Sequence, residues 1–298
     1  MKQRFLFLTV LVPALLIPAL LLLSGCKRKP AEIVIIPDVQ KNHLQRNHIF
    51  GQVKELCTYT LLPENSVAQN DTMALDSLRF DTVSVMVQHY SPDGYLLDYC
   101  KMTPQGDTLA VRIFAYHADA RADYWKEFYP GEPDTVVCHY EYDMNDFLSA
   151  EKIFVRDSVL STTSYKTDGE GNVIEMVRHY DGYSVRNTSK YNAQGLLSRI
   201  DEFEPSGKLF KYVTIEYDNY GDEVNRRAFK GENDLIEYTY TQYQDNGALL
   251  KVLFEDRLHN DKEQYVYAGH DQQNNWTSET RYKNKKLQYK RIRTYIYY

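Results

Sequence analysis

Apolar and polar residues follow two different patterns along the chain. Residues 5–23 are apolar apart from one threonine, whereas beyond residue 80 short mixed runs rich in tyrosine, valine, isoleucine and threonine alternate with turn residues. Such runs, for example 83–87 and 211–217, favour the pleated surface of a strand. No segment after residue 80 has the 3.6-residue period of a helix, although 73–78 is suited to one helical turn. The pattern predicts an all-β fold.

The turn residues repeat at nearly fixed intervals. An aromatic residue stands four places before a glycine or asparagine at five successive corners, which are Tyr191–Gly195, Phe203–Gly207, Tyr217–Gly221, Phe229–Asn233 and Tyr243–Gly247. The aromatics are 12, 14, 12 and 14 residues apart, so the repeating unit is a pair of hairpins 26 residues long. Glycine closes a type I turn in the left-handed region without steric cost, and asparagine is the usual second choice. The tyrosine corners are therefore expected at one edge of a sheet and the phenylalanine corners at the other.

Further turn signals, two of them Pro–Gly turns and the rest weaker, extend this rhythm through most of the chain. They are Ser91–Gly94, Thr103–Gly106, Asp119, Gly131, Asn145–Asp146, Asp157–Ser158, Gly171, Gly182, Asn260, Asn274–Asn275 and Asn284. The whole set gives about sixteen corners between residues 90 and 290, a spacing typical of all-β chains. The chain is therefore predicted to form a long antiparallel β-meander of consecutive hairpins.

The expected strands do not separate apolar from polar residues by face. In 196–203 each face carries apolar side chains together with charged or hydroxyl side chains, and 222–229 shows the same mixture. The strands of a β-sandwich separate the two kinds more sharply. We therefore expect a sheet that is at least partly single-layered, with tyrosine rings and the stems of Lys, Arg and Glu covering its faces.

The repeat resembles the YD-repeat family, also called RHS repeats, in which a tyrosine–aspartate pair precedes a glycine turn. Residues 217–221 (YDNYG) match best, while 191–195 and 243–247 have the aspartate replaced. The resemblance covers most of 83–298 and implies a similar local β-structure. The toxin-enclosing role of very long YD arrays is not expected, because this chain is too short to close such a shell.

The N-terminal residues have the features of a targeting segment. Lys2 and Arg4 precede the apolar run, and Leu23-Ser24-Gly25-Cys26 resembles the bacterial lipobox. The alternative is a retained transmembrane anchor, which Pro13 and Pro18 disfavour. We expect a signal peptide over 1–25, a lipidated Cys26 with a tether over 26–46, and a repetitive β-meander domain over 47–298. The resemblance implies acyl chains on Cys26 and hence attachment to a membrane.

Charge argues against one class of partner. Without Lys2 and Arg4 the 35 basic residues become 33, against 41 acidic residues, which gives the mature chain a net charge of −8. An acidic protein is a poor partner for nucleic acid, so none is expected.

Cysteine, histidine and carboxylate residues show no arrangement typical of a catalytic or metal site. Cys57, Cys100 and Cys138 are an odd number without C-x-x-C spacing, so at least one thiol is expected to stay free or to pair between chains. Cys138 and His139 are neighbours on a strand and should point to opposite faces. Phosphate-binding, dinucleotide-binding and H-E-x-x-H motifs are missing from the sequence. The sequence predicts no enzyme activity, no metal site and no cofactor.

A triplet of Asp, then Ser or Thr, then an aliphatic residue recurs along the chain. Its hydroxyl residues are Thr72, Ser77, Thr82, Thr108, Thr135 and Ser158. The triplet resembles an O-glycosylation sequon of exported proteins in one phylum of Gram-negative bacteria, which implies sugar at these hydroxyls. The alternative is that Asp-Thr-Val is a natural sequence for a corner that leads into a strand.

A longer expected corner, 269–276, carries His270 and Trp276 and is the candidate ligand contact, because loops of this kind often carry recognition residues. The leading functional hypothesis is a lipid-anchored protein of the bacterial envelope, at the outer membrane, whose repetitive β-surface binds or scaffolds an envelope protein or a glycan. The two alternatives are a carbohydrate-active enzyme of the envelope and an accessory factor in envelope assembly or export.

Overall fold

The structure is a computed structural model that describes residues 42–64, 79–231 and 233–298. Within these ranges the chain forms the short helix α1 (His43–Arg46) and eighteen strands. The strands are β1 (Val53–Pro63), β2 (Phe80–Tyr90), β3 (Leu96–Met102), β4 (Thr108–Tyr116), β5 (Ala122–Phe128), β6 (Thr135–Tyr142), β7 (Leu148–Val155), β8 (Ser158–Thr167), β9 (Val173–Tyr180), β10 (Tyr183–Tyr191), β11 (Leu197–Phe203), β12 (Leu209–Tyr217), β13 (Glu223–Lys230), β14 (Asp234–Tyr243), β15 (Leu249–Asp256), β16 (Asp261–His270), β17 (Trp276–Lys283) and β18 (Lys286–Tyr297). No helix in this part of the chain is long and apolar enough to cross a membrane.

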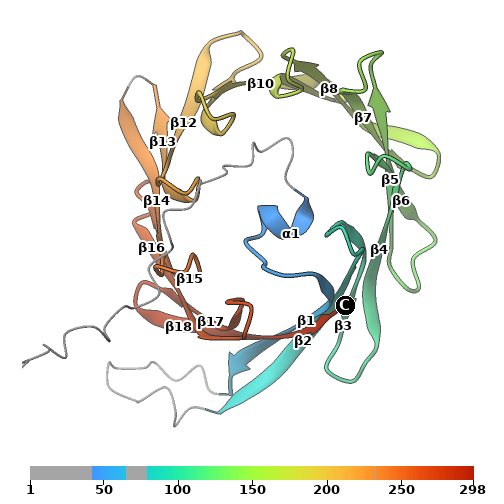
Figure 1. The fold of residues 1–298 in the computed structure, drawn as a ribbon. Helices are drawn as coiled ribbons and strands as arrows, with labels where there is room; N and C mark the ends of the chain where they lie inside the picture. The colour runs from blue at the N-terminus through green and yellow to red at the C-terminus, as the bar shows by residue number, and fades with distance from the viewer. Residues whose placement is uncertain (1–41, 65–78, 232) are drawn as a thin grey trace, which may run out of the picture.

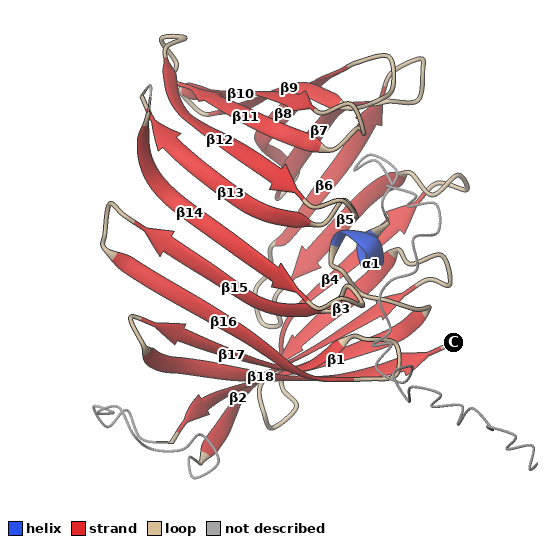
Figure 2. Ribbon diagram, turned by 60° about the vertical axis from the view of Figure 1, so that its left-hand side comes forward, coloured by secondary structure: helices blue, strands red, loops and turns tan. Residues whose placement is uncertain are grey.

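Each strand pairs antiparallel with the next, which confirms the all-β meander of consecutive hairpins (Figure 2). The last strand, β18, pairs with β1 over eight residue pairs and closes the sheet into a barrel (Figure 1). The expectation of a partly single-layered sheet is therefore corrected. Strand twist and repeated bulges curve the sheet until its two edges meet, and neither effect is visible in a residue pattern.

The corners lie where the turn chemistry predicts them. Sixteen hairpin connections join β2 to β18, and the expected left-handed residues include Asp146, Asn260 and Asn284. One position is wrong. At the corner between β13 and β14 the left-handed residue is Gly231 and not Asn233.

The barrel has two distinct rims. The tyrosine rim consists of the corners that follow the even-numbered strands, and the opposite rim consists of the corners that follow the odd-numbered strands. Tyr191, Tyr217 and Tyr243 end even-numbered strands, whereas Phe203 ends β11 and Phe229 lies at the end of β13. Because consecutive strands run antiparallel, this arrangement confirms the prediction of a tyrosine edge and a phenylalanine edge.

The core is a small apolar cluster inside the barrel. The helix α1 lies within the ring of strands (Figure 1), and its buried Leu44 forms a cluster with Ile49, Val53, Leu56 and Tyr90. Leu56 therefore points inward from β1. Cross-strand partners share a face, so the register that pairs Leu56 with Gln88 and Tyr295 carries the inward face from strand to strand around the barrel.

Candidate binding site in the barrel lumen

The inward face of the wall carries aromatic rings and ion pairs. On β3, β4 and β5 the register places Tyr99, Arg112 and Glu127 side by side. The Nε atom of Arg112 donates to Glu127 at 3.1 Å, and the Tyr99 hydroxyl donates to the other carboxylate oxygen at 3.1 Å. The Arg112 guanidinium also lies 4.2 Å from the ring centroid of the inward-facing Trp125. This group of a cation, a carboxylate and aromatic rings is one wall cluster.

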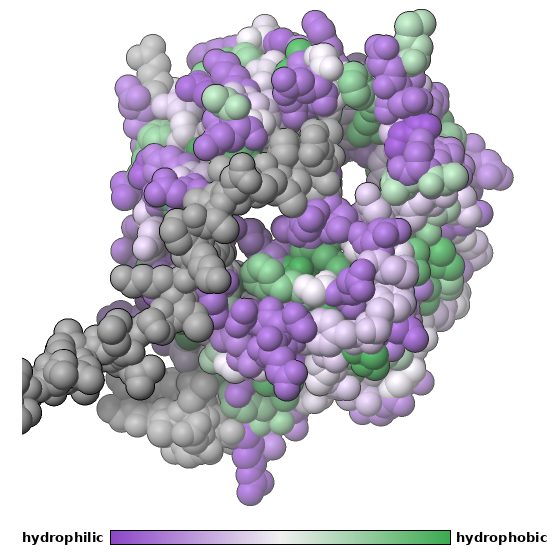
Figure 3. Space-filling view, viewed as in Figure 1, coloured by the Kyte–Doolittle hydropathy of each residue, from purple (hydrophilic) through white to green (hydrophobic). Residues whose placement is uncertain are grey.

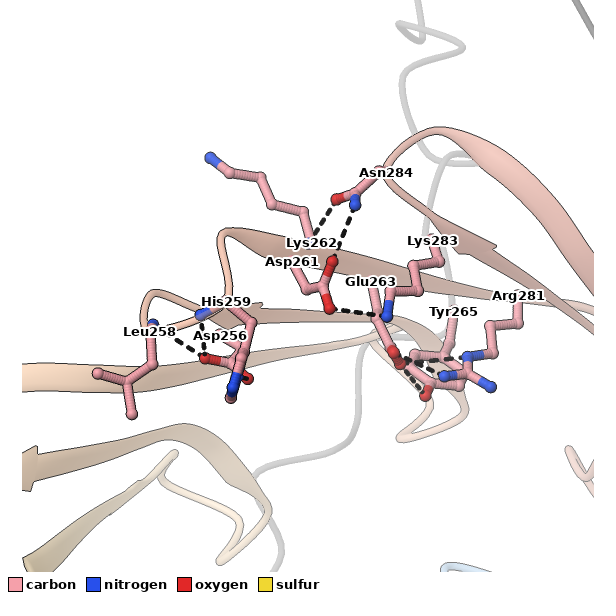
Figure 4. A network of polar contacts seen from close by, with 10 residues as sticks. All are labelled: Asp256, Leu258, His259, Asp261, Lys262, Glu263, Tyr265, Arg281, Lys283 and Asn284. Carbon is pink, nitrogen blue, oxygen red and sulfur yellow. Dashed lines mark hydrogen bonds and ion pairs between the residues drawn. The ribbon is translucent and has the colours of Figure 1, made fainter.

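Similar clusters recur around the lumen. Arg281 on β17 donates from Nη2 to Glu263 on β16 at 2.6 Å, and the Tyr265 hydroxyl donates to the same carboxylate at 2.6 Å (Figure 4). On β7 and β9, Glu151 pairs with Arg178 at 3.4 Å. The charges of these three clusters are therefore held in pairs beside aromatic rings.

Burial and pairing fix the protonation states of these clusters. Burial alone would raise the pKa of Glu127, but the hydrogen bond and positive charge of Arg112 outweigh it and hold that pKa below its usual value. Glu263 has a lowered pKa for the same reasons, with Arg281 as its partner. Burial raises the pKa of Tyr140 to about 12 and raises the pKa of Tyr99. At neutral pH the wall therefore presents ionised pairs and protonated phenols.

The tyrosine rim is held by one recurring hydrogen bond. The phenol at the end of an even-numbered strand donates to the backbone carbonyl at the start of the preceding odd-numbered strand, at 2.6 to 3.2 Å. The donor–acceptor pairs are Tyr116 to Leu96, Tyr142 to Ala122, Tyr191 to Val173, Tyr217 to Leu197 and Tyr243 to Glu223. Each tyrosine thus links two neighbouring hairpins, which explains its recurrence in the repeat.

The segment that contains α1 crosses the lumen at the tyrosine rim. The Leu44 N–H donates to the carbonyl of Gly94 at 3.2 Å, on the β2–β3 corner. Asn275, on the β16–β17 corner, accepts from the N–H of Phe50 at 2.7 Å and donates to its carbonyl at 2.8 Å. Between them His48 lies 3.7 Å from Asp222. The segment therefore narrows this mouth, beside which the space-filling view is hollowed (Figure 3).

The structure places the two candidate ligand contacts within this framework. His270 ends β16, where other even-numbered strands have the rim tyrosine. Its Nε2 atom lies 3.1 Å from the carbonyl of Leu249 at the start of β15, so it takes the place of the tyrosine hydroxyl. Trp276 is 7% exposed and lies between the Tyr267 ring, at 5.1 Å, and the Arg293 guanidinium, at 3.7 Å. Both residues support the rim locally, and the binding of a ligand by them stays a prediction.

Four of the candidate glycosylation residues are described, and all lie toward the opposite rim. Thr108, Thr135 and Ser158 begin β4, β6 and β8, and Thr82 is the third residue of β2. Thr135 and Ser158 are exposed, whereas Thr82 and Thr108 are half-buried. Thr72, Ser77 and the lipidation residue Cys26 lie outside the described residues. Glycosylation and lipidation stay predictions.

The three described cysteines are free. Because their number is odd, at least one of them was expected to lack a partner within the chain. Cys138 faces the lumen beside Trp125, while His139 faces outward beside Tyr124, which confirms their opposite orientations. Burial raises the pKa of Cys138 to about 12, so its thiol is protonated and unreactive at neutral pH. No cluster of potential metal ligands is found among the described residues.

The outer face differs from one side of the barrel to the other. On β1, β2, β4 and β18 the residues that the register turns outward are mostly apolar. The apolar ones include Tyr59, Val85, Val87, Val111, Ile113 and Ile292, and the polar ones include Glu55 and His89. On β9 to β13 the outward residues include ion pairs between Arg186 and Glu175, at 2.7 Å, and between Arg227 and Glu216, at 2.5 Å.

Sequence reasoning missed the lumen wall. Its residues alternate with outward residues along every strand, so the signal was the mixture of apolar and charged side chains on both faces. That mixture is expected when one face lines a wet lumen and the other meets solvent.

Comparisons with known proteins give neither a family nor a function. No family model matches the chain, and no curated protein matches it. Among solved structures, a porin-like protein from Bacteroides uniformis is 13% identical, with 83% of this chain and 98% of that chain covered and a TM-score of 0.44. A porin-like protein from Bacteroides vulgatus is 11% identical, with coverages of 82% and 98% and a TM-score of 0.32. TcdB2-TccC3 is 12% identical over 78% of this chain but only 16% of its own, with a TM-score of 0.35. None of these likenesses is close enough to carry an argument.

Proposed function

We propose that this protein is a lipid-anchored, non-enzymatic binding protein of the bacterial envelope whose lumen wall holds an extended glycan or a segment of an envelope protein. The observation that carries the proposal is the wall of paired Arg and Glu residues beside tyrosine and tryptophan rings. Such a wall offers stacking surfaces and charge-assisted hydrogen bonds at many positions, which suits a long polar ligand better than a small one.

The outer face supports a barrel that stands beside the membrane. A bilayer-spanning barrel needs an apolar outward band on all its strands. Here the outward pairs Arg186–Glu175 and Arg227–Glu216 lie within strands of one side. Charges of this kind are costly against lipid, whereas an acylated Cys26 would hold the barrel at the membrane surface.

The carboxylates of the lumen favour binding over hydrolysis. A glycosidase of the usual kind needs a carboxylic acid that stays protonated near neutral pH. Glu127 and Glu263 have lowered pKa values because of their arginine partners, and Glu279 pairs with Arg291 at 3.3 Å. Glu127 and Glu263 are therefore ionised, and all three carboxylates have an arginine partner, which makes them poor general acids.

Neighbouring residues of β2 test the binding surface. Met86 faces the lumen and Val85 faces outward. A photo-crosslinking phenylalanine analogue at position 86 should capture the ligand in living cells, and the same analogue at position 85 should not. Equal capture at both positions, or none at 86, contradicts lumen binding.

The anchor is tested separately. Radiolabelled palmitate should enter the wild-type protein and not the Cys26→Ser variant. Equal labelling of the two proteins refutes lipidation at Cys26 and leaves the lumen experiment intact.

A further inference from the structure

A second concave surface lies on the outside of the barrel, over β5, β6 and β7, separate from the lumen. It is a groove of about 640 Å³, within the range typical of small-ligand sites. The lining residues that could contact a ligand are Tyr124, Lys126, Asp134, His139, Phe154 and Arg156. The register turns Tyr124, His139 and Phe154 outward, so this groove is independent of the lumen wall.

The floor of the groove is a strip of three aromatic rings. The ring centroids of Tyr124 and His139 are 5.8 Å apart and tilted by 51°, and those of His139 and Phe154 are 5.8 Å apart at 78°. The Nζ atom of Lys126 lies 5.1 Å from the Tyr124 ring centroid. The first pair is tilted and the second is nearly perpendicular, so neither pair is stacked face to face.

One other outward aromatic pair, on β12 and β13, differs in this respect. Tyr212 and Phe229 stack at 4.8 Å with an interplanar angle of 15°, and Tyr212 is buried. Stacked rings of this kind satisfy each other and leave little aromatic surface for a ligand. The strip on β5 to β7 is unstacked and lies in a groove.

Polar groups close one end of the groove. The β5–β6 connection, residues 129–134, brings Pro133 and Asp134 to the groove, and the β7–β8 corner contributes Arg156 and Asp157. Arg156 forms an ion pair with Asp134, which ties the two corners together. Asp157 is exposed beside this pair. The groove therefore has an aromatic floor and hydrogen-bonding groups at one end.

We propose that this groove binds a short saccharide. The C–H face of a pyranose ring packs on an aromatic ring, and its hydroxyls exchange hydrogen bonds with carboxylates and with Lys or Arg donors. Tyr124, His139 and Phe154 supply the first interaction, and Asp134, Asp157, Arg156 and Lys126 supply the second. The site goes beyond the proposed lumen function and does not depend on it.

The test is titration of the full chain with maltohexaose, cellohexaose, chitohexaose and mannohexaose, followed by calorimetry and by saturation-transfer NMR. At least one of these sugars should bind the wild-type protein or, if a sugar attached to Thr135 already fills the groove, the Thr135→Ala protein. Tyr124→Leu and Phe154→Leu should each weaken binding by about tenfold or more, the usual effect of removing an aromatic anchor.

The matched control is Tyr59→Leu, which removes an exposed outward tyrosine from β1 and should leave binding unchanged. Circular dichroism of each variant verifies that the barrel is folded, and Arg156→Ala provides a further variant outside the strands. The proposal is overturned if neither wild type nor Thr135→Ala binds any of the four sugars. It is also overturned if the folded groove variants bind the sugar as tightly as the Tyr59→Leu protein does. A third contrary result is that peptides from a random heptapeptide library bind the groove and none of the sugars does.

Discussion

The two rims of the barrel are built from hairpin corners of the same chain, yet they differ in regularity. At the tyrosine rim the corners share one pair of backbone hydrogen bonds, as in Asp218 N–H to Asp222 at 3.0 Å and Gly221 N–H to Asp218 at 3.2 Å. At the opposite rim two corners share this form, while others are as short as 156–157 or as long as 129–134. Five of the tyrosine-rim corners follow a tyrosine whose hydroxyl donates to a backbone carbonyl, so the regular corner form and this hydrogen bond occur together at one rim.

The difference also separates structure from candidate recognition. The tyrosine rim holds α1 and the apolar core, whereas the opposite rim supplies the polar end of the outer groove and the described glycosylation candidates. Substitutions at the tyrosine rim should therefore change stability, and matched substitutions at the opposite rim should change it little.

The largest effect is expected in the core below the tyrosine rim. Leu56→Ala removes a fully buried side chain and should lower the free energy of unfolding by about 3 kcal/mol. Val159→Ala, at a position 55% exposed near the opposite rim, should change it by less than about 0.5 kcal/mol. Urea unfolding followed by circular dichroism measures both, and similar losses would abolish the distinction between the rims.

Two glycines sharpen the comparison. Gly94 and Gly106 both have left-handed backbones, with φ of +84° and +93°. A Cβ at Gly94 would lie 2.6 Å from the Asn42 side chain, which caps α1, whereas a Cβ at Gly106 meets nothing within 4 Å. Gly94→Ala should therefore cost about 1 kcal/mol more than Gly106→Ala, the value of a lost cap.

Proteolysis is the second measurement on the same pair. Gly94→Ala should expose the α1 segment to cleavage, and Gly106→Ala should not. Equal cleavage of the two variants would show that α1 does not depend on the β2–β3 corner.

A smaller effect is expected from one rim hydroxyl. Tyr217→Phe loses the 2.8 Å hydrogen bond to the Leu197 carbonyl and should cost about 1 kcal/mol. Tyr183, 54% exposed at the opposite rim, is the control, and Tyr183→Phe should leave the denaturation midpoint unchanged. The rim interpretation fails if the two variants unfold at the same urea concentration.

The smallest effect is a pH dependence at the opposite rim. The Asp256 hydrogen bond raises the pKa of His259, and the pKa of Asp256 is lowered by the same contact (Figure 4). The contribution of His259 to stability is full below its ordinary pKa and is lost as pH rises through the raised value. The contribution of Asp256 is lost as pH falls through its lowered value, so the pair stabilises most between about pH 4 and 6.5.

NMR titration of the His259 ring measures this contact directly. Asp256→Asn should lower the pKa of His259 toward its ordinary value, while the unfolding midpoint hardly moves because both groups are exposed. An unchanged titration would show that the two side chains do not interact in solution.

Turn chemistry made the corners predictable, and the reason is local. Proline, glycine and asparagine decide a backbone angle within a few residues, so corners such as 103–106 and 204–207 could be located from the sequence alone. The mixed faces of 196–203 were also a true signal, since in a barrel of this kind both faces meet polar surroundings.

Closure, the short helix and the outer groove could not be predicted, because each depends on distant residues. The pairing of β1 with β18 joins segments more than 200 residues apart. α1 has four residues and is held by the β2–β3 corner, and the residues that follow it are held by the β16–β17 corner. His270 and Trp276 were selected for the length of their corner, but their neighbours in space make them part of the rim.

The pairing of β1 with β18 has a consequence for how the chain is made. Every other strand finds its partner among its immediate neighbours in sequence, so most of the sheet can assemble as synthesis proceeds. Until β18 has been synthesised, the free edge of β1 has one row of unpaired backbone N–H and C=O groups. The most recently synthesised strand has a second free edge of the same kind. Such free edges favour strand pairing between nascent molecules and hence aggregation. Deletion of β18 should therefore cause the protein to aggregate. This effect should be larger than the loss of stability expected from removing the contacts of one strand.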